Sequence, residues 1–254
     1  MKKTALFLAI AALASAPAFA ADFVNGGFED GNLGGWTGGG GTWSSSVTPP
    51  VVGNQAPLDP NIYNGGPANN TLMTGGTDPI TGANRVYVGN NSVRVNDSVN
   101  DYSVSTIRQS VTGYANNSIF FAWNAVLEDS HGLTDSDYFS LTLRDDTTNT
   151  DIVSRAYSSA GSIGAGTSGV TWTQFGNWFS SGWVVEAIDL VALGSVGHDF
   201  TLTLLASDCP YGGHAGYVYL DGFGSVIPTP EPASLALLGI GLFGLAASRR
   251  RKAA

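Results

Sequence analysis

Short segments of the chain alternate apolar and polar side chains, and clusters of Gly, Asn and Asp separate these segments. In DYFSLTLRD (137–145), Phe139, Leu141 and Leu143 fall on one face of an extended chain, and the residues between them fall on the other. The segment HDFTLTLLAS (198–207) repeats the pattern. Alternation with a period of two predicts antiparallel strands that have one buried face and one face in water.

The same kind of pattern extends along most of the chain between its two ends. Further strands are expected at 85–88, 104–111, 119–126, 152–157, 171–178, 184–191 and 216–226. No segment between the two ends has a convincing helical period. About nine or ten strands predict an all-β fold, an antiparallel β-sandwich of the jelly-roll type over residues 21–226.

The region 38–84 breaks this pattern, because it is rich in Gly, Pro, Asn and Thr and has few apolar residues. It is expected to be a long loop. Loops of this length are uncommon inside a compact domain and are often functional. A binding loop and a tolerated surface insertion both remain open.

The N-terminus has the three parts of a secretory signal peptide. Lys2 and Lys3 precede an apolar run at 5–14, and Ala18-Phe19-Ala20 supplies the small residues that signal peptidase accepts. Residues 1–20 are therefore predicted to form a signal helix that signal peptidase removes. The protein is expected to be exported.

The C-terminus carries a second apolar run, the thirteen apolar or glycine residues 235–247. This is shorter than the ~20 residues that span a bilayer, yet it has no polar face. Four basic residues follow almost at once, and such charges favour the cytoplasmic side: Arg249, Arg250, Arg251 and Lys252. A short hydrophobic helix that enters the membrane is predicted, and a buried core helix is the alternative.

Pro230, Glu231 and Pro232 precede this apolar run. Together, the three elements within 227–254 resemble the PEP-CTERM sorting signal of Gram-negative bacteria. The resemblance implies transient anchoring in the inner membrane, processing by an exosortase near the Pro-Glu-Pro, and arrival at the cell surface or outside the cell. It also implies an association with exopolysaccharide and biofilm matrix.

Charge narrows the set of partners. Residues 21–230 contain five arginines, no lysine and nineteen acidic residues, a formal net charge of −14. This surface repels nucleic acid, whereas neutral glycans and divalent cations remain compatible with it. The only cysteine, Cys209, cannot form an intrachain disulfide, so another element is expected to reinforce the fold.

The segment DFVNGGFEDGNLGGWT (22–37) resembles the opening strand of jelly-roll, galactose-binding-like modules, and VYLDGFGSV (218–226) resembles their last strand. First and last strands of a sandwich can lie side by side. Phe28 and Trp36 are interpreted as core anchors rather than ligand-stacking residues.

By this resemblance, Glu29 and Asp221 are expected to bind a structural Ca²⁺. Asp22 or Asp30 and backbone carbonyls would complete the oxygen ligands that calcium prefers. The alternative is that Glu29 and Asp221 are solvated acids at strand ends.

A second candidate site lies in the segments VLEDSHG (126–132) and SDCPYGGHAGYVYLD (207–221), which resemble parts of sandwich domains in bacterial surface proteins. Acid, imidazole and thiol groups at one edge of a sandwich suit a transition metal. Their spacing matches no standard zinc motif, so hydrogen bonds that hold the loops are the alternative. The candidate residues are Glu128, Asp129, His131, Asp208, Cys209 and His214.

The sequence shows no Gly-x-Ser-x-Gly elbow, no His-Glu-x-x-His helix and no phosphate loop, so a non-catalytic protein is predicted. Exposed Trp and Tyr rings would bind sugars, and Trp183 and Tyr211 are the candidates. Trp172 and Trp178 could instead share a buried strand face. The predicted function is binding of exopolysaccharide or other glycans. The alternatives are a structural or adhesive matrix component without a sugar site and, less favoured, a polysaccharide hydrolase.

Overall fold

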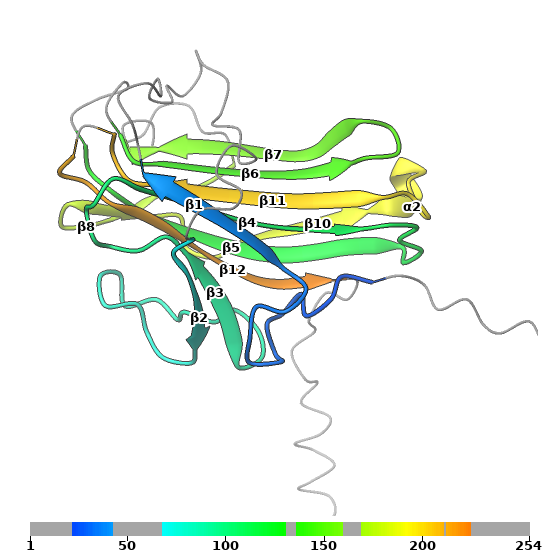
Figure 1. Ribbon diagram of the computed structural model, residues 1–254, viewed down its shortest axis with the longest axis horizontal. Coiled ribbons are helices and arrows are strands. Elements are labelled where there is room, and N and C mark those ends of the chain that lie inside the picture. Colours follow the sequence, from blue (N-terminus) through cyan, green and yellow to red (C-terminus); the bar gives the residue numbers. More distant parts are fainter. Residues whose placement is uncertain (1–21, 43–67, 131–135, 160–168, 211, 225–254) are drawn as a thin grey trace, which may run out of the picture.

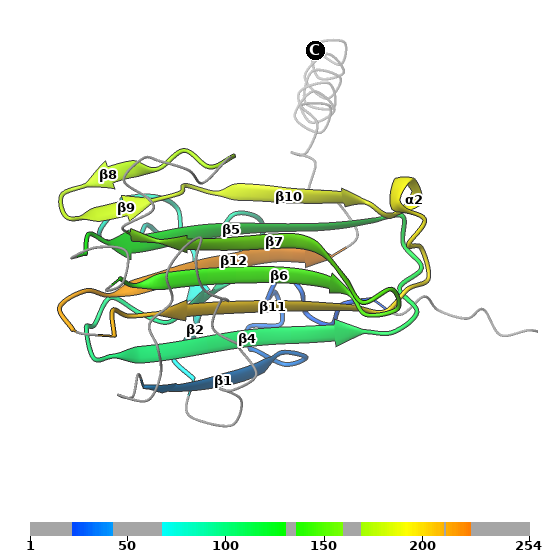
Figure 2. The same cartoon turned by 90° about the horizontal axis from the view of Figure 1, so that it is seen from above.

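Two antiparallel sheets face each other in the computed structural model, and the core lies between them (Figures 1 and 2). The structure describes residues 22–42, 68–130, 136–159, 169–210 and 212–224. The predicted signal helix 1–20 and sorting signal 227–254 lie outside these residues. Among the described residues, no helix is long and apolar enough to cross a membrane.

The sheets have five and seven strands. The five-stranded sheet has the order β1 (Thr37–Thr42), β4 (Ser103–Val111), β11 (Phe200–Ser207), β6 (Tyr138–Asp145), β7 (Thr150–Ser158). The seven-stranded sheet has the order β2 (Asn70–Thr74), β3 (Asn91–Val95), β12 (Gly216–Gly224), β5 (Ser118–Glu128), β9 (Trp178–Ser180), β8 (Thr173–Phe175), and β10 (Val184–Asp189) also pairs with β5. The fold is the predicted all-β jelly-roll sandwich.

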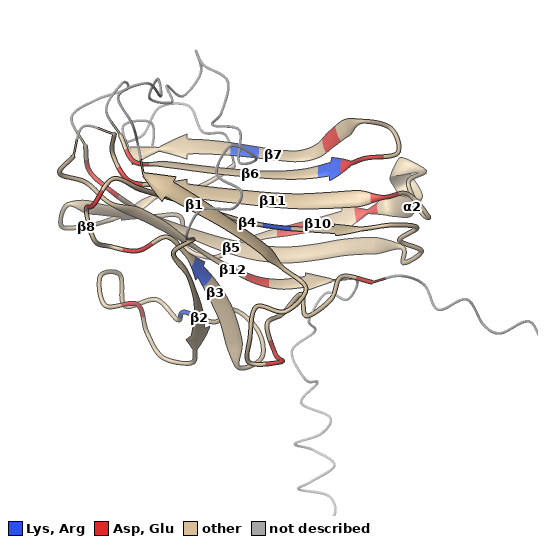
Figure 3. Ribbon diagram, in the orientation of Figure 1, with Lys and Arg blue, Asp and Glu red and all other residues tan. Residues whose placement is uncertain are grey.

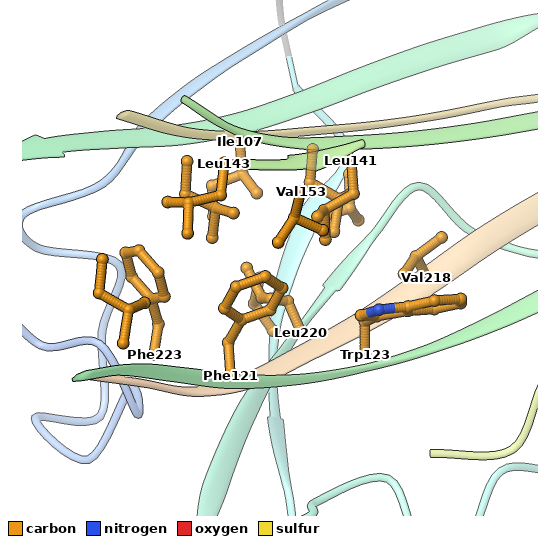
Figure 4. Packing of buried hydrophobic residues seen from close by; sticks show 14 of the residues in the cluster. Ile107, Phe121, Trp123, Leu141, Leu143, Val153, Val218, Leu220 and Phe223 are labelled. Atoms are coloured by element: carbon orange, nitrogen blue, oxygen red, sulfur yellow. The ribbon is translucent and has the colours of Figure 1, made fainter. Parts of the chain in front are cut away.

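The strands predicted from alternation are confirmed at 104–111, 119–126 and 152–157. In β6, Phe139, Leu141 and Leu143 are fully buried, as their spacing predicts. These side chains meet apolar residues of β5 and β12 in the core (Figure 4). Each buried Leu or Phe contributes roughly 1.5–3 kcal/mol to stability.

Three expected elements differ in the structure. The segment 85–88 is not a strand, and the strand of this region is β3. The expected strand 171–178 is two short strands, β8 and β9, joined by a turn at Gly176. The expected strand 184–191 ends at Asp189, whose carboxylate accepts a hydrogen bond from the amide of Ala192 and begins the short helix α2 (Leu190–Leu193).

The expected loop 38–84 also contains strands. β1 pairs with β4, and β2 pairs with β3. β1 has the sequence TGGGGT, so its pairing depends on backbone hydrogen bonds and leaves no apolar alternation to detect. Residues 43–67 of this expected loop lie outside the described residues.

A polar contact joins the two sheets at the edge formed by β7 and β10. The guanidinium of Arg155 makes two hydrogen bonds with the carboxylate of Glu186, at 2.8 and 2.9 Å. The indole N–H of the buried Trp123 donates to the same carboxylate at 3.2 Å. These bonds stabilise the edge of the sandwich that no strand pairing closes.

Candidate functional site

The N-terminal segment folds as a series of turns over residues 22–36, not as the expected strand. It nevertheless reaches the last strand, because the amide of Phe223 donates to the carbonyl of Gly26 at 3.1 Å. The first strand, β1, lies in the other sheet from β12. The expectation that first and last strands lie side by side is therefore wrong, and turns replace the first strand in this contact.

Phe28 and Trp36 anchor this segment to the core, as predicted. Phe28 is fully buried, and its ring stacks on Trp36 with 5.1 Å between ring centroids. Trp36 also contacts Phe223 of the last strand. Neither ring is placed as a free stacking surface for a ligand.

Glu29 extends from these turns to the segment that leads into β3. Its Oε1 accepts hydrogen bonds from the amides of Asn90 and Asn91, both at 2.9 Å. Gly89 lies directly beneath the carboxylate, since a Cβ atom there would lie 2.5 Å from Oε1. The carboxylate therefore has a fixed position.

Asp221 approaches the same segment from β12. Its Oδ2 accepts from the amides of Tyr87 and Val88 at 2.7 and 2.9 Å, whereas its buried Oδ1 has no hydrogen-bond partner. Burial raises the pKa of Asp221 to about 7 against the effect of these amides, and the charge of Glu29 contributes to the rise.

These two carboxylates fit a calcium ion in part. A buried oxygen without a donor beside a second acid is where a cation lowers the free energy of the folded state. Asp22 and Asp30 are exposed, and Asp22 accepts a hydrogen bond from the amide of its neighbour Phe23. The described residues hold no group of three or more His, Cys, Asp or Glu suited to a metal, so carbonyl oxygens would supply the other ligands.

The second candidate site lies toward the other end of β12, where Asp208 is fully buried. Its carboxylate accepts hydrogen bonds from the side-chain amide of Asn96 and from the backbone amides of Asp101 and Ser103. The hydroxyl of Ser103 donates to it as well. Burial still raises the pKa of Asp208 to about 7.

Other predicted residues of this site also hold loops. Oε2 of Glu128 accepts from the amide of Ala215 at 3.0 Å, and the amide of Cys209 donates to the carbonyl of His214 at 3.0 Å. Cys209 is buried. These contacts agree with the loop-holding alternative. His131 lies outside the described residues, so a transition-metal site at this edge stays a prediction. Tyr211, a predicted sugar-binding residue, also lies outside them.

Asp137 is a buried carboxyl that the sequence analysis did not identify. Neither of its carboxyl oxygens has a hydrogen-bond partner among the described residues. Burial and the nearby charge of Asp208 hold the pKa of Asp137 well above its usual range. Its place in the polar run TDSD (134–137), just before β6, was the only signal in the sequence.

Aromatic side chains gather on the outer face of the seven-stranded sheet. The ring of Trp183 is half-buried, and Tyr87 is 42% exposed. The centroids of the two rings are 5.5 Å apart. The indole N–H of Trp183 donates to the carbonyl of Asn84 at 2.9 Å, which fixes the ring. Trp172 and Trp178 do not share a face, because Trp172 packs against the core and Trp178 against this outer cluster.

Residues 75–90, here called the strap, cover part of this face. Asp78 of the strap accepts hydrogen bonds from the hydroxyls of Tyr217 and Tyr219, at 2.7 and 2.8 Å. Burial alone would raise the pKa of Asp78, but the hydrogen bonds it accepts lower it below its usual value. The strap thus buries Tyr217 and Tyr219 and leaves Tyr87 and Trp183 at the surface.

Comparison with known proteins adds the C-terminal signal. Residues 228–252 match the model of the PEP-CTERM protein-sorting motif. The matched range contains all the predicted sorting residues: Pro230, Glu231, Pro232, Arg249, Arg250 and Arg251. No curated protein matches the chain. The chain is therefore a jelly-roll β-sandwich protein that carries a PEP-CTERM sorting motif.

Several solved carbohydrate-binding modules are similar in fold at low identity. TmCBM61 in complex with β-1,4-galactotriose has a TM-score of 0.39 and 10% identity over 80% of this chain and 95% of that chain. CBM28, a carbohydrate-binding module specific for non-crystalline cellulose, has a TM-score of 0.36 and 10% identity over 79% of this chain and 92% of that chain. CBM27-1 of Caldicellulosiruptor saccharolyticus, in complex with mannohexaose, has a TM-score of 0.35 and 8% identity over 79% and 94%.

Proposed function

We propose that this protein is an exported, non-catalytic protein that binds extracellular polysaccharide through the outer face of its seven-stranded sheet. The observation that carries the proposal is the surface pair of Tyr87 and Trp183. Sugar rings stack on such aromatic faces, and a ring already fixed by a hydrogen bond loses little freedom on binding. Val185 is 41% exposed and continues the apolar surface on β10.

Glycan binding is expected to depend on these two rings. Trp183→Ala and Tyr87→Ala should each weaken binding to the host exopolysaccharide by about tenfold or more, roughly 1.4 kcal/mol. Trp183→Phe should keep most of the affinity because a ring remains. Affinity electrophoresis and a glycan array with the full chain measure these effects.

Tyr102→Asn is the matched control, because Tyr102 is 44% exposed at a different edge and asparagine tolerates its positive φ of 66°. This variant should bind like the wild type. If no glycan binds, or if Trp183→Ala binds unchanged, the structural or adhesive matrix role replaces this proposal. Turnover of the bound polysaccharide would favour the hydrolase alternative.

We propose in addition that an exosortase processes the chain near Pro230-Glu231-Pro232, after transient anchoring in the inner membrane. The last described strand ends at Gly224, so cleavage near Pro230-Glu231-Pro232 would leave the sandwich intact. Mass spectrometry of the exported protein should find no peptide from 235–247. Replacing the three residues by alanine should retain the uncleaved chain in the membrane, and recovery of 235–247 from wild-type surface protein would exclude the processing step.

A structural calcium ion at Glu29 and Asp221 is the third part of the proposal. A ligand that binds only the folded state at a hundredfold excess over Kd stabilises it by about 2.7 kcal/mol. Addition of EGTA should therefore lower Tm by about 5–10 °C. Glu29→Gln and Asp221→Asn should remove the response, whereas Asp151→Asn, an exposed acid on β7, should keep it. A Tm that ignores calcium would exclude the ion.

A further inference from the structure

Two arginines on the outer face of the seven-stranded sheet lack the acidic partners that Arg144 and Arg155 have. Arg144 and Arg155 form ion pairs with carboxylates. Arg85 and Arg94 form no ion pair with a carboxylate in the part of the chain that the structure describes, although residues 21–230 contain nineteen acids. Arg85 and Arg94 therefore differ in this respect from Arg144 and Arg155 of the other sheet.

Arg94 lies in β3 between Thr71 of β2 and Tyr219 of β12. Its guanidinium carbon lies 5.6 Å from the centre of the Tyr217 ring. The buried Nε atom has no hydrogen-bond acceptor among the described residues. The ring thus supports the guanidinium from one side, and no acidic group pairs with it.

Arg85 belongs to the strap, and its guanidinium lies near β2. Nη2 donates to the carbonyl of Gly75 at 3.2 Å, Nη1 lies 4.0 Å from the sulfur of Met73, and the buried Nε has no acceptor among the described residues. Figure 3 shows the basic segments on β3 and on the strap in the same part of the molecule.

Both positive charges act on the same tyrosine. Burial and hydrogen bonding to Asp78 raise the pKa of the Tyr219 hydroxyl, and the charges of Arg94 and Arg85 oppose that rise. Asp78 already accepts two tyrosine hydroxyls, so one acid stands against two guanidinium groups. Among the charges that act on Tyr219, the two guanidinium groups outnumber the one carboxylate.

We infer that Arg85 and Arg94 bind the acidic group of a charged sugar, so that the polysaccharide bound by this face is anionic. The inference rests on the proposed glycan binding at Tyr87 and Trp183. The ring centroids of Tyr219 and Trp183 are 6.3 Å apart, and Tyr219 lies opposite Arg94 on the neighbouring strand. Tyr219 therefore connects the aromatic surface to the arginines.

The chemistry of the guanidinium group supports this ligand class. Its planar donors match a carboxylate, and a sulfate ester offers similar acceptors. Trp183 directly precedes β10, which lies three strands from β3, across β12 and β5. Neighbouring strands are ~4.8 Å apart, so β3 and β10 are about 14 Å apart, within the length of an oligosaccharide. At physiological ionic strength the Debye length is ~8 Å, which screens the acids at the ends of the sandwich.

The test compares two probes that differ only in charge, a short oligogalacturonate and its methyl ester, by calorimetry at one calcium concentration. The wild-type full chain should bind the acid at least tenfold more tightly, and this preference should fall as salt rises. Arg94→Gln and Arg85→Gln should remove the preference without weakening binding of the ester. Arg144→Gln, on the outer face of the other sheet, should leave both affinities unchanged.

Each outcome decides between the proposals. Equal binding of acid and ester would overturn the anionic ligand and leave glycan binding intact, whereas no binding of either probe or of the host exopolysaccharide would overturn both. Tighter binding of a sulfated oligosaccharide than of the oligogalacturonate would assign the acidic group as sulfate. If Arg94→Gln unfolds, Arg94→Lys keeps the charge above Tyr217 but loses the planar fork, and an undiminished preference in it would contradict the inference.

Discussion

Replacing Gly26 by alanine is expected to lower the free energy of unfolding by about 3 kcal/mol or more. A Cβ atom at this position would lie 1.6 Å from the carbonyl oxygen of Phe223, which is backbone and cannot move alone. The turn segment 22–36 would have to separate from β12. It would also lose the contact between the rings of Phe23 and Phe223, whose centroids are 3.9 Å apart.

Gly27→Ala is the matched control for this effect. The nearest atom to its Cβ would be Cγ of Glu29 at 3.7 Å, an ordinary contact, so the free energy of unfolding should change by less than about 1 kcal/mol. Urea unfolding followed by tryptophan fluorescence measures both variants. Equal stability of the two variants would show that the contact with the last strand does not hold the N-terminal segment.

This contact also explains why the sequence predicted part of the N-terminal region correctly. Phe28 and Trp36 could be assigned to the core because large aromatic side chains are usually buried. The backbone could not be assigned, because positive φ angles at Asn25 and Phe28 bend a segment that looks extended in sequence. Glu29 and Asp221 were chosen through resemblance, and the structure brings both to the segment 87–91.

Other elements were predictable only where side chains alternate. β6 and β11 have buried Leu and Phe at every second position, which the sequence displays directly. β1 consists mainly of glycine, and its strand state depends on pairing with β4, more than sixty residues away. The surface pair of Tyr87 and Trp183 is likewise a contact between distant segments, so no local pattern reveals it.

The buried acids near the start of β12 predict an unusual dependence of stability on pH. An unfolded aspartate releases its proton near pH 4, whereas Asp208 in the fold keeps its proton to about pH 7. Between these values the unfolded chain has released a proton that the folded protein still holds. The contribution of Asp208 to stability is therefore complete below about pH 4, decreases as pH rises, and is lost above about pH 7.

Asp137 also makes the protein less stable as pH rises, because burial and the charge of Asp208 raise the pKa of Asp137 well above its usual value. From pH 5 to pH 8, Asp208 alone should lower the free energy of unfolding by about 3 kcal/mol, at 1.4 kcal/mol per unit. Below pH 4 the opposite trend begins, because Asp78 and Asp145 have lowered pKa values and their contribution is lost on protonation. Maximum stability is expected near pH 4–5.

The last prediction assigns this pH dependence to the pair. Asp208→Asn removes one titrating group and the charge that helps to raise the pKa of Asp137, so the decrease in the free energy of unfolding between pH 5 and pH 8 should be smaller by about 3 kcal/mol. Urea unfolding at a series of pH values measures this, with Asp151→Asn, an exposed acid, as control. The comparison of variants isolates the pair from Asp221, whose pKa is also raised. A wild-type protein that is as stable at pH 8 as at pH 5 would mean that neither Asp137 nor Asp208 holds its proton in the fold.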